Sequence, residues 1–137
     1  LKGGYNMSPI SYTSCILSNG LKVVNFSSPH PFTFDTGEIL PACHKEWVNK
    51  MSLDITETEE PWNGSHSITD VKLHVSIPKY VLGVLERLET NGDIDVVIIP
   101  FMLLQALKDS GHSYKKCRVI RLVDRVTKII HSNKFCI

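Results

Sequence analysis

The sequence predicts an α+β fold with a mostly antiparallel β-sheet core, built from hairpins and two to three short helices. Two observations support this prediction: β-rich runs separated by turn residues, and two helical patterns interleaved with strands in the second half. With 137 residues, of which 42% are apolar and 21% charged, the chain is long enough for one core and too short for two. We therefore expect a weakly ordered arm over residues 1–11 and a single ligand-binding domain over residues 12–137.

The first predicted element is a β-hairpin within "TSCILSNGLKVVNF". Its centre, Asn19-Gly20, tolerates the positive φ angles of a tight type I′ turn. In the following "NFSSPHPFTF", Pro29 and Pro31 fix φ at about −65° and push the preceding residues toward extended geometry. We interpret this stretch as a rigid corner with His30 on an extended backbone.

A strand follows this corner, and the two rings of Phe32 and Phe34 alternate with polar residues, so they share one face. Paired phenylalanines on a strand are usually core, although they could also stack on a planar ligand. Next, a short helix is expected from about residue 43 to residue 50, with Trp47, Val48 and Met51 facing inward.

The middle of the chain predicts two strands around a loop. "SLDITETE" has strand character, and "EEPWNGSHS" is typical of a loop whose Trp62 either folds back onto the core or awaits a partner. We interpret Asn63-Gly64-Ser65 as turn residues and not as a glycosylated site. "ITDVKLHVSI" then alternates apolar and polar residues, which predicts a half-buried strand. Its apolar positions are Val71, Leu73, Val75 and Ile77.

Two helices and a buried strand follow in order. "PKYVLGVLERLETNG" predicts a helix that begins at Pro78 and has Asn91-Gly92 as its C-cap. "DIDVVIIP" is β-branched on both faces and predicts a buried central strand. "PFMLLQALKDSG" predicts a helix from Pro100 to Ser110. The remaining "KCRVIRLVDRVTKIIHSNKF" predicts one or two strands, with any bend near Asp124.

Composition excludes several classes of protein. A net charge of +1 disfavours a duplex-DNA binder, and no apolar run approaches the roughly 20 residues of a membrane span. The N-terminus has no secretory h-region, so a cytoplasmic setting is expected, with reduced and mostly buried cysteines. No C-x-x-C pair or helical histidine pair indicates a metal site, and no cofactor is expected.

The charge distribution is nevertheless uneven and leaves a local anion site open. Residues 115–134 carry seven Lys and Arg against one Asp, whereas residues 54–60 carry four acids. Within "CRVIRLVDRVTK", Arg118, Arg121 and Arg125 could donate in pairs to phosphate oxygens. The alternative is a solvated strand face on which Asp124 pairs with a neighbouring arginine.

Two further residues are candidates for ligand contact. Phe101 opens a helix directly after the buried strand, where backbone N–H groups also favour an anion. His30 either forms structural hydrogen bonds at its corner or contacts a ligand. Cysteine–histidine catalysis remains possible, because such groups meet in space and not in sequence.

Three long stretches, "VVNFSSPHPFTFDTGEILPAC", "DVVIIPFMLLQALKDSG" and "CRVIRLVDRVTKIIHSNKFC", resemble the first-described family of phage-encoded anti-Thoeris sponges. The resemblance covers about residues 14–136 and does not align residues 51–68. It implies a non-enzymatic anti-defence protein of the infected bacterial host's cytoplasm. Such a protein sequesters a cyclic ADP-ribose isomer, and some relatives also hold cyclic di- or trinucleotides. The resemblance further implies that the protein forms a dimer or an assembly of dimers.

Carried onto this sequence, the resemblance implies Arg118, Arg121 and Arg125 for phosphates. It further implies Asp124 for ribose hydroxyls and Phe101 for base stacking, and we place His30 toward the same pocket or an interface. Two alternatives stay open. One is a nucleotide-processing enzyme such as a cyclic phosphodiesterase, and the other is a small phage interaction or structural protein that uses the basic C-terminal segment.

Overall fold

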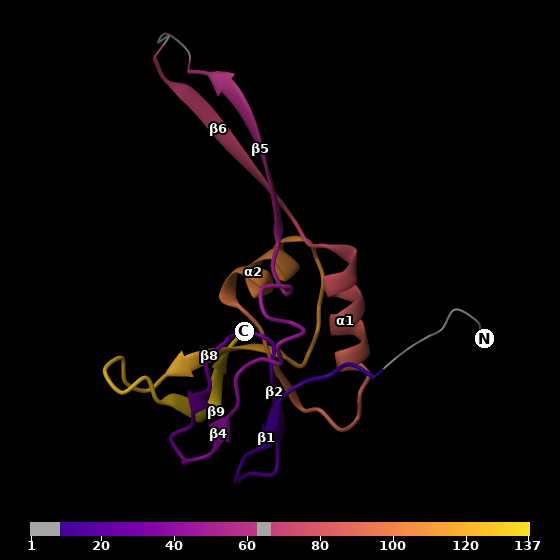
Figure 1. Ribbon diagram of the computed structural model, residues 1–137, viewed down its shortest axis with the longest axis vertical. Coiled ribbons are helices and arrows are strands. Elements are labelled where there is room, and N and C mark those ends of the chain that lie inside the picture. Colours follow the sequence, from indigo (N-terminus) through magenta and orange to yellow (C-terminus); the bar gives the residue numbers. More distant parts are fainter. Residues whose placement is uncertain (1–8, 63–66) are drawn as a thin grey trace, which may run out of the picture.

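The computed structural model describes residues 9–62 and 67–137, and its main element is a five-stranded sheet of order β1-β2-β7-β8-β9. The three central strands β2, β7 and β8 are parallel, and β1 and β9 flank them as antiparallel edge strands (Figure 1). Their bounds are β1 Ser14–Ile16, β2 Lys22–Asn25, β7 Val96–Ile98, β8 Cys117–Leu122 and β9 Ile130–Cys136.

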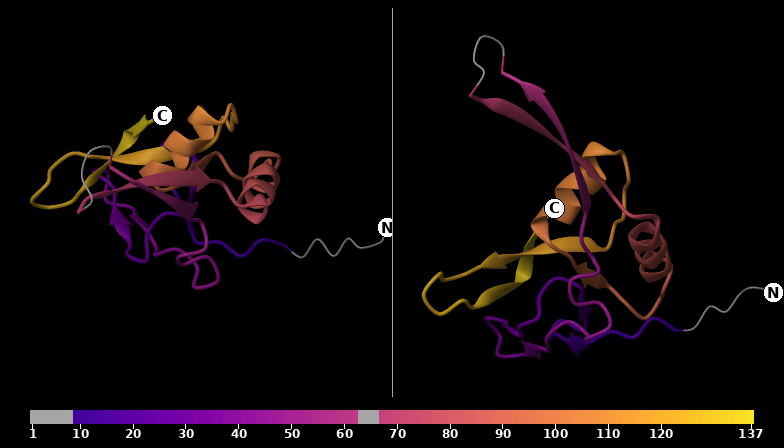
Figure 2. Two further views of the ribbon diagram at one scale, coloured as in Figure 1. Left: turned by 90° about the horizontal axis from the view of Figure 1, so that it is seen from above. Right: turned by 45° about the horizontal axis from the view of Figure 1, so that its top comes forward.

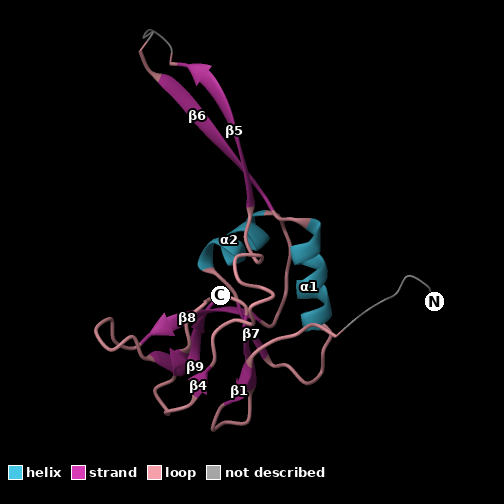
Figure 3. Ribbon diagram, in the orientation of Figure 1, coloured by secondary structure: helices cyan, strands magenta, loops and turns pink. Residues whose placement is uncertain are grey.

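Two helices cover one face of this sheet, α1 Lys79–Glu89 and α2 Phe101–Asp109 (Figure 3). The small hairpin of β3 Phe32–Thr33 and β4 Ile39–Leu40 contributes to the core on the other face. The predicted α+β class with two helices and mostly antiparallel pairing is therefore confirmed. The two parallel pairs lie at the centre of the sheet, where β7 is buried throughout as predicted.

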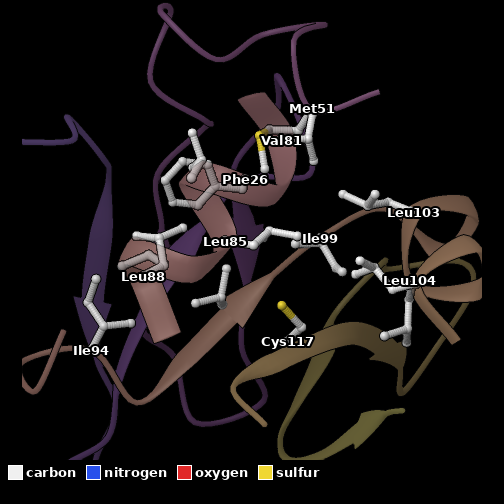
Figure 4. Close-up of a cluster of buried hydrophobic side chains, with 14 residues drawn as sticks. Phe26, Met51, Val81, Leu85, Leu88, Ile94, Ile99, Leu103, Leu104 and Cys117 are labelled. Atoms are coloured by element: carbon white, nitrogen blue, oxygen red, sulfur yellow. The ribbon is translucent and has the colours of Figure 1, made fainter. Parts of the chain in front are cut away.

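The alternation of side chains along the strands divides the core into two clusters. Val24 and Val97 point toward the helices, where they join a cluster with Leu85 of α1 and Leu107 of α2. Figure 4 shows this cluster, with Leu85 and Leu104 labelled. Their neighbours in sequence, Val23, Val96 and Ile98, point to the opposite face and pack with Phe34 and Leu40. "NFSSPHPFTF" therefore supplies both clusters, since Phe26 belongs to the first and Phe34 to the second.

The first hairpin forms as predicted, but its turn is not type I′. The Leu17 N–H donates to the Leu21 carbonyl at 2.9 Å and the Gly20 N–H to the Leu17 carbonyl at 2.8 Å, which encloses three residues. Gly20 has φ +89°, whereas Asn19 does not have a positive φ. A three-residue loop with glycine at its last position replaces the two-residue loop, because only one left-handed residue is needed.

The prediction of a helix over residues 43–50 is wrong. This segment forms consecutive turns in which Trp47 N–H donates to His44 O at 2.8 Å and Lys50 N–H to Trp47 O at 3.0 Å. Asn49, at φ +64°, interrupts the right-handed backbone. Met51 is nevertheless buried as expected, and Trp47 packs against the core. The apolar side chains therefore face inward as predicted, but from turns and not from a helix.

Both long helices begin at the predicted prolines, Pro78 and Pro100, which lie at their N-caps. The first ends at Thr90, one residue before the expected Asn91-Gly92 cap. The second has its C-cap at Ser110 and stops at Gly111, whose φ is +78°. Neither described helix is long and apolar enough to span a bilayer.

The basic C-terminal segment forms two antiparallel strands and not one continuous strand. Its chain reverses over residues 123–129, where the Val123 N–H donates to the Ile129 carbonyl at 2.8 Å and Lys128 adopts φ +58°. The register also shifts between Ile120 and Leu122. The alternation expected for a single strand therefore ends at this turn.

The largest departure from the sequence prediction is a two-stranded ribbon that projects from the domain (Figure 2). Strands β5 Asp54–Pro61 and β6 Thr69–Ser76 pair along their whole length, and every residue of both is exposed. The predicted half-burial of β6 is therefore wrong, because nothing within residues 9–62 and 67–137 covers its apolar face. Trp62 directly follows β5, where its N–H donates to the Ile68 carbonyl at 3.0 Å, and its side chain is 45% exposed and belongs to neither core cluster.

Two predictions concern residues outside this description, namely the ordering of residues 1–8 and the turn at Asn63-Gly64-Ser65. The four cysteines are free thiols, with Cys43 and Cys117 buried and Cys15 and Cys136 partly buried.

Candidate functional site at the carboxyl ends of the parallel strands

Parallel pairing of β2, β7 and β8 places the carboxyl ends of all three strands at one edge of the sheet. In open sheets with parallel strands, ligands commonly bind beyond such carboxyl ends, because each strand there leads into a loop or a helix N-terminus. Three sequence-predicted residues follow or end these strands: His30 after β2, Phe101 after β7 and Arg121 at the end of β8. The topology thus places each of the three at or beyond the carboxyl end of its strand.

The loop after β2 is held by Asn25, a fully buried polar residue. Its Oδ1 accepts hydrogen bonds from the backbone N–H groups of Ser27 at 2.9 Å and Ser28 at 3.1 Å, and its Nδ2 donates to the Pro41 carbonyl at 3.0 Å. The hydroxyl of Ser28 in turn accepts from the His30 N–H at 3.0 Å. This network confirms a rigid corner and leaves the His30 side chain exposed.

A hollow of about 140 Å³ lies between this loop and the start of α2. Its wall includes Ser27, Ser28 and Pro100, the N-cap residue of α2, with Trp47 and Met51 among its apolar residues. No side chain caps the N-terminus of α2, so backbone N–H groups there are open to an external acceptor. The hollow therefore combines hydroxyl groups with an apolar wall, and it adjoins the N-cap residue of α2.

Phe101, the first residue of α2, directly follows Pro100, which lines this hollow. Its side chain is 60% exposed. A large aromatic ring at such exposure is available for stacking on a planar ligand. Its neighbour Met102 is 63% exposed, so the apolar surface continues along the first turn of α2.

The basic residues of the C-terminal hairpin separate into two groups. Arg121 is exposed near the end of β8, and Arg125 is exposed in the turn that follows. Asp124 lies in the same turn, where its Oδ1 accepts the Val126 N–H at 2.8 Å and its backbone carbonyl accepts the Lys128 N–H at 2.8 Å. Asp124 therefore stabilises the turn itself, and its other carboxylate oxygen is the one available for a ligand hydroxyl.

Arg118 is held elsewhere. Its guanidinium donates to the Cys117 carbonyl at 2.9 Å and to the Lys115 carbonyl, which turns the side chain toward the amino end of β8. There it lines a second groove of about 440 Å³ near the end of α2, together with Lys108 and Lys115. The rings of His112 and Tyr114 lie stacked at this groove, with centroids 6.4 Å apart. The structure therefore does not bring Arg118 to the carboxyl-end site.

An acidic residue beside the hairpin is tied to β9. Asp35 Oδ1 accepts the Ser132 N–H at 3.1 Å, and its Oδ2 lies 3.8 Å from His131 Nδ1. Hydrogen bonding with Ser132, helped by His131, holds the pKa of Asp35 below its usual value. This pair fastens the turn after β3 to the start of β9, which directly follows the turn over residues 123–129.

Comparison of the chain with protein-family models, curated proteins and solved structures gives no match. Within residues 9–62 and 67–137, no group of three or more His, Cys, Asp or Glu side chains is placed to hold a metal ion. The function is therefore argued from the residues gathered at the carboxyl-end site.

Sequence reasoning predicted His30, Phe101 and Arg121 as candidate residues, and it missed two features of the structure. Asn25 is buried and organises the loop. The only sign of this in the sequence is that a polar residue stands at the end of an apolar strand. The groove around Lys108, Lys115 and Tyr114 was also missed, and "GHSYKKC", a polar run between a helix and a strand, is the signal that could have indicated it.

Proposed function

We propose that this protein binds a cyclic nucleotide signal, such as a cyclic ADP-ribose isomer or a cyclic oligonucleotide, and sequesters it without degrading it. The observation that supports the proposal is that a hydroxyl-rich loop, an exposed aromatic ring and an arginine each lie at or beyond the carboxyl end of one of the parallel strands β2, β7 and β8. These groups match the three parts of such a ligand: ribose hydroxyls, a base and a phosphate.

Each group has a distinct part in the proposed complex. The uncapped N-terminus of α2 and Arg121 would attract phosphate oxygens, the helix through its N–H groups and the arginine through a bidentate contact. Phe101 would stack on the base, and Ser28 and His30 would lie near the ribose. Asp124 and Arg125, on the adjoining turn, would extend the contact away from the hollow.

The size of the hollow limits how one subunit can bind. At about 140 Å³ it is well below the roughly 300–1,000 Å³ typical of small-molecule sites, so it would enclose only part of a cyclic nucleotide. A ligand bound at about 1 nM needs roughly −12 kcal/mol, which exposed contacts alone do not supply. A second subunit that completes the wall is therefore part of the proposal.

The proposal is tested by capture and release. Purified protein is mixed with a panel of cyclic ADP-ribose isomers and cyclic oligonucleotides, freed of unbound ligand, heat-denatured and analysed by mass spectrometry. Recovery of one unchanged compound supports sequestration. A hydrolysed product would make the protein a nucleotide-processing enzyme, and failure to capture any member would contradict the proposal.

Two variants locate the site in the same assay. Phe101→Ala and Arg121→Ala should each weaken capture at least about tenfold, because each removes one recognition group. Ile16→Ala at the end of β1 and Lys79→Ala on α1 are matched controls, since they remove a similarly exposed apolar side chain and an equal charge elsewhere. Equal loss in the controls would show that the site is not at the carboxyl ends of the strands.

A further inference from the structure

The ribbon of β5 and β6 has one apolar and one polar face, as the pairing register defines. Ile55 lies opposite Val75, Glu57 opposite Leu73 and Glu59 opposite Val71, so these six side chains share a face, here called the ribbon face. Ile55, Val71, Leu73 and Val75 on it are 49–61% exposed. The other face is polar, with Thr58 Oγ1 and His74 Nε2 2.9 Å apart and Lys72 paired to Glu60 at 3.4 Å.

Such a ribbon needs a covering partner. It extends eight residues per strand, about 26 Å at roughly 3.3 Å per residue, and isolated two-stranded ribbons are only marginally stable in water. The apolar stripe also continues into a groove of about 310 Å³ at the ribbon's base, lined by Val75, Ile77 and Met102. A continuous exposed apolar surface of this kind marks an interaction site.

Charge on the ribbon face indicates the chemistry of the partner. Glu57 and Glu59 flank the apolar stripe, and neither forms an ion pair with any residue that the structure describes. A surface that covers this face must therefore be apolar and also carry positive charge.

The turn between β8 and β9 has the complementary chemistry. Here called the basic turn, it consists of residues 122–128 and exposes Val123 at 48% and Val126 at 89%. Arg125 and Lys128 lie in the same turn, and neither has an ion pair within the described part of the chain. The ribbon and the basic turn lie apart in one molecule, so one chain does not satisfy both surfaces (Figure 1).

We infer that the ribbon face of one copy docks on the basic turn of a second copy. In this contact the apolar stripe packs on Val123 and Val126, while Glu57 and Glu59 pair with Arg125 and Lys128. Two such contacts related by a two-fold axis form a closed dimer, and repetition without closure forms a larger assembly. The inference does not depend on the proposed nucleotide binding, because it concerns the protein without ligand.

Charge reversal on each surface, followed by mixing, tests this contact. One variant carries Glu57→Lys and Glu59→Lys, and the other carries Arg125→Glu and Lys128→Glu. Each alone should dissociate at least about tenfold more readily than wild type, since like charges then meet in every contact. An equimolar mixture of the two should associate again, because each reversed ribbon meets a reversed turn and each native ribbon a native turn.

Sedimentation velocity without nucleotide measures the association, and circular dichroism verifies that each variant is folded. Controls with the same charge changes on exposed residues elsewhere are Glu46→Lys with Asp93→Lys, and Lys45→Glu with Lys50→Glu. These controls should associate like wild type.

A monomeric wild-type protein at about 100 μM would overturn the inference, as would reversed variants that still associate. Dissociation of both variants without recovery on mixing would show that the two surfaces do not meet each other. Because the assay contains no nucleotide, these outcomes are independent of whether the capture experiment succeeds.

Discussion

Strands β6 and β7 differ in how well their sequences predicted their burial: the prediction is confirmed for β7 and wrong for β6. β6 has the regular apolar and polar alternation of a half-buried strand, yet all eight of its residues are exposed. β7 has only three residues without alternation, and all are buried between two parallel neighbours. Alternation therefore shows that one face of a strand is apolar, but it does not show whether the same chain covers that face.

The sharpest test of this difference compares the reactivity of thiols. Cys117 at the start of β8 is 3% exposed, and burial, with Glu89 nearby, raises its pKa to about 12. At pH 8 only about one Cys117 in 10,000 is then a thiolate. A cysteine introduced by Leu73→Cys on the ribbon should be alkylated more than about a hundredfold faster in dilute protein.

Mass spectrometry of the two modified peptides measures both rates in one sample. In guanidinium chloride the rates should converge, which controls for intrinsic reactivity. Similar rates in the folded protein would mean that the ribbon is covered or that β8 opens readily.

The next largest effect is expected from truncating an apolar side chain in each region. Leu107→Ala on α2, at 2% exposure, should lower the free energy of unfolding by about 2–5 kcal/mol, because it leaves a cavity. Leu73→Ala, at 61% exposure, should change it by less than about 0.5 kcal/mol. Urea unfolding of dilute protein measures both, and an equal loss at Leu73 would place the ribbon in a packed core.

A smaller effect is expected at the buried amide that organises the loop after β2. Asn25→Ala should cost about 1–3 kcal/mol, since it leaves the Ser27 and Ser28 N–H groups and the Pro41 carbonyl without this partner. Asn133→Ala on the exposed part of β9 is the control and should be nearly neutral. Thermal unfolding distinguishes the two, and a neutral Asn25→Ala would show that water replaces the amide.

The smallest effect is expected from acid titration of Asp35. The pKa of Asp35 in the folded protein lies below the usual 3.8. The stabilisation from Asp35 is therefore fully present above pH 3.8 and is lost as the pH falls through the pKa of the folded state. Asp35→Asn should therefore flatten the loss of stability between about pH 5 and pH 2. Urea midpoints across this range measure the slope, and an unchanged slope would show that the Ser132 and His131 contacts do not stabilise the fold.

Local patterns predicted much of the fold. The prolines at Pro78 and Pro100 located both helix starts, and the β-branched run before Pro100 located the central strand. The same kind of reasoning failed for residues 43–50, where inward apolar residues sit on consecutive turns. Helical spacing over so few residues does not distinguish a helix from turns, because both can place the same side chains inward.

Local chemistry predicted candidate residues for the site but not their arrangement. His30, Phe101 and Arg121 stay predictions, and Arg118 was grouped with Arg121 by its place in one arginine-rich run. The side-chain bonds of Arg118 to the Cys117 and Lys115 carbonyls turn it into a different groove. Spacing in sequence could not predict this separation, because it depends on the contacts that each arginine makes after folding.

The sequence by itself determined the α+β class, the two long helices, the buried central strand and the rigid corner around His30. Each depends on interactions among residues close in sequence, such as the fixed φ of proline or the period of an apolar face. Only the tertiary structure decided that β2, β7 and β8 run parallel and that the apolar face of β6 is left uncovered by the described part of the chain. Strand pairing and burial join residues far apart in sequence, so a local pattern shows which face needs a partner but not which part of the molecule provides it.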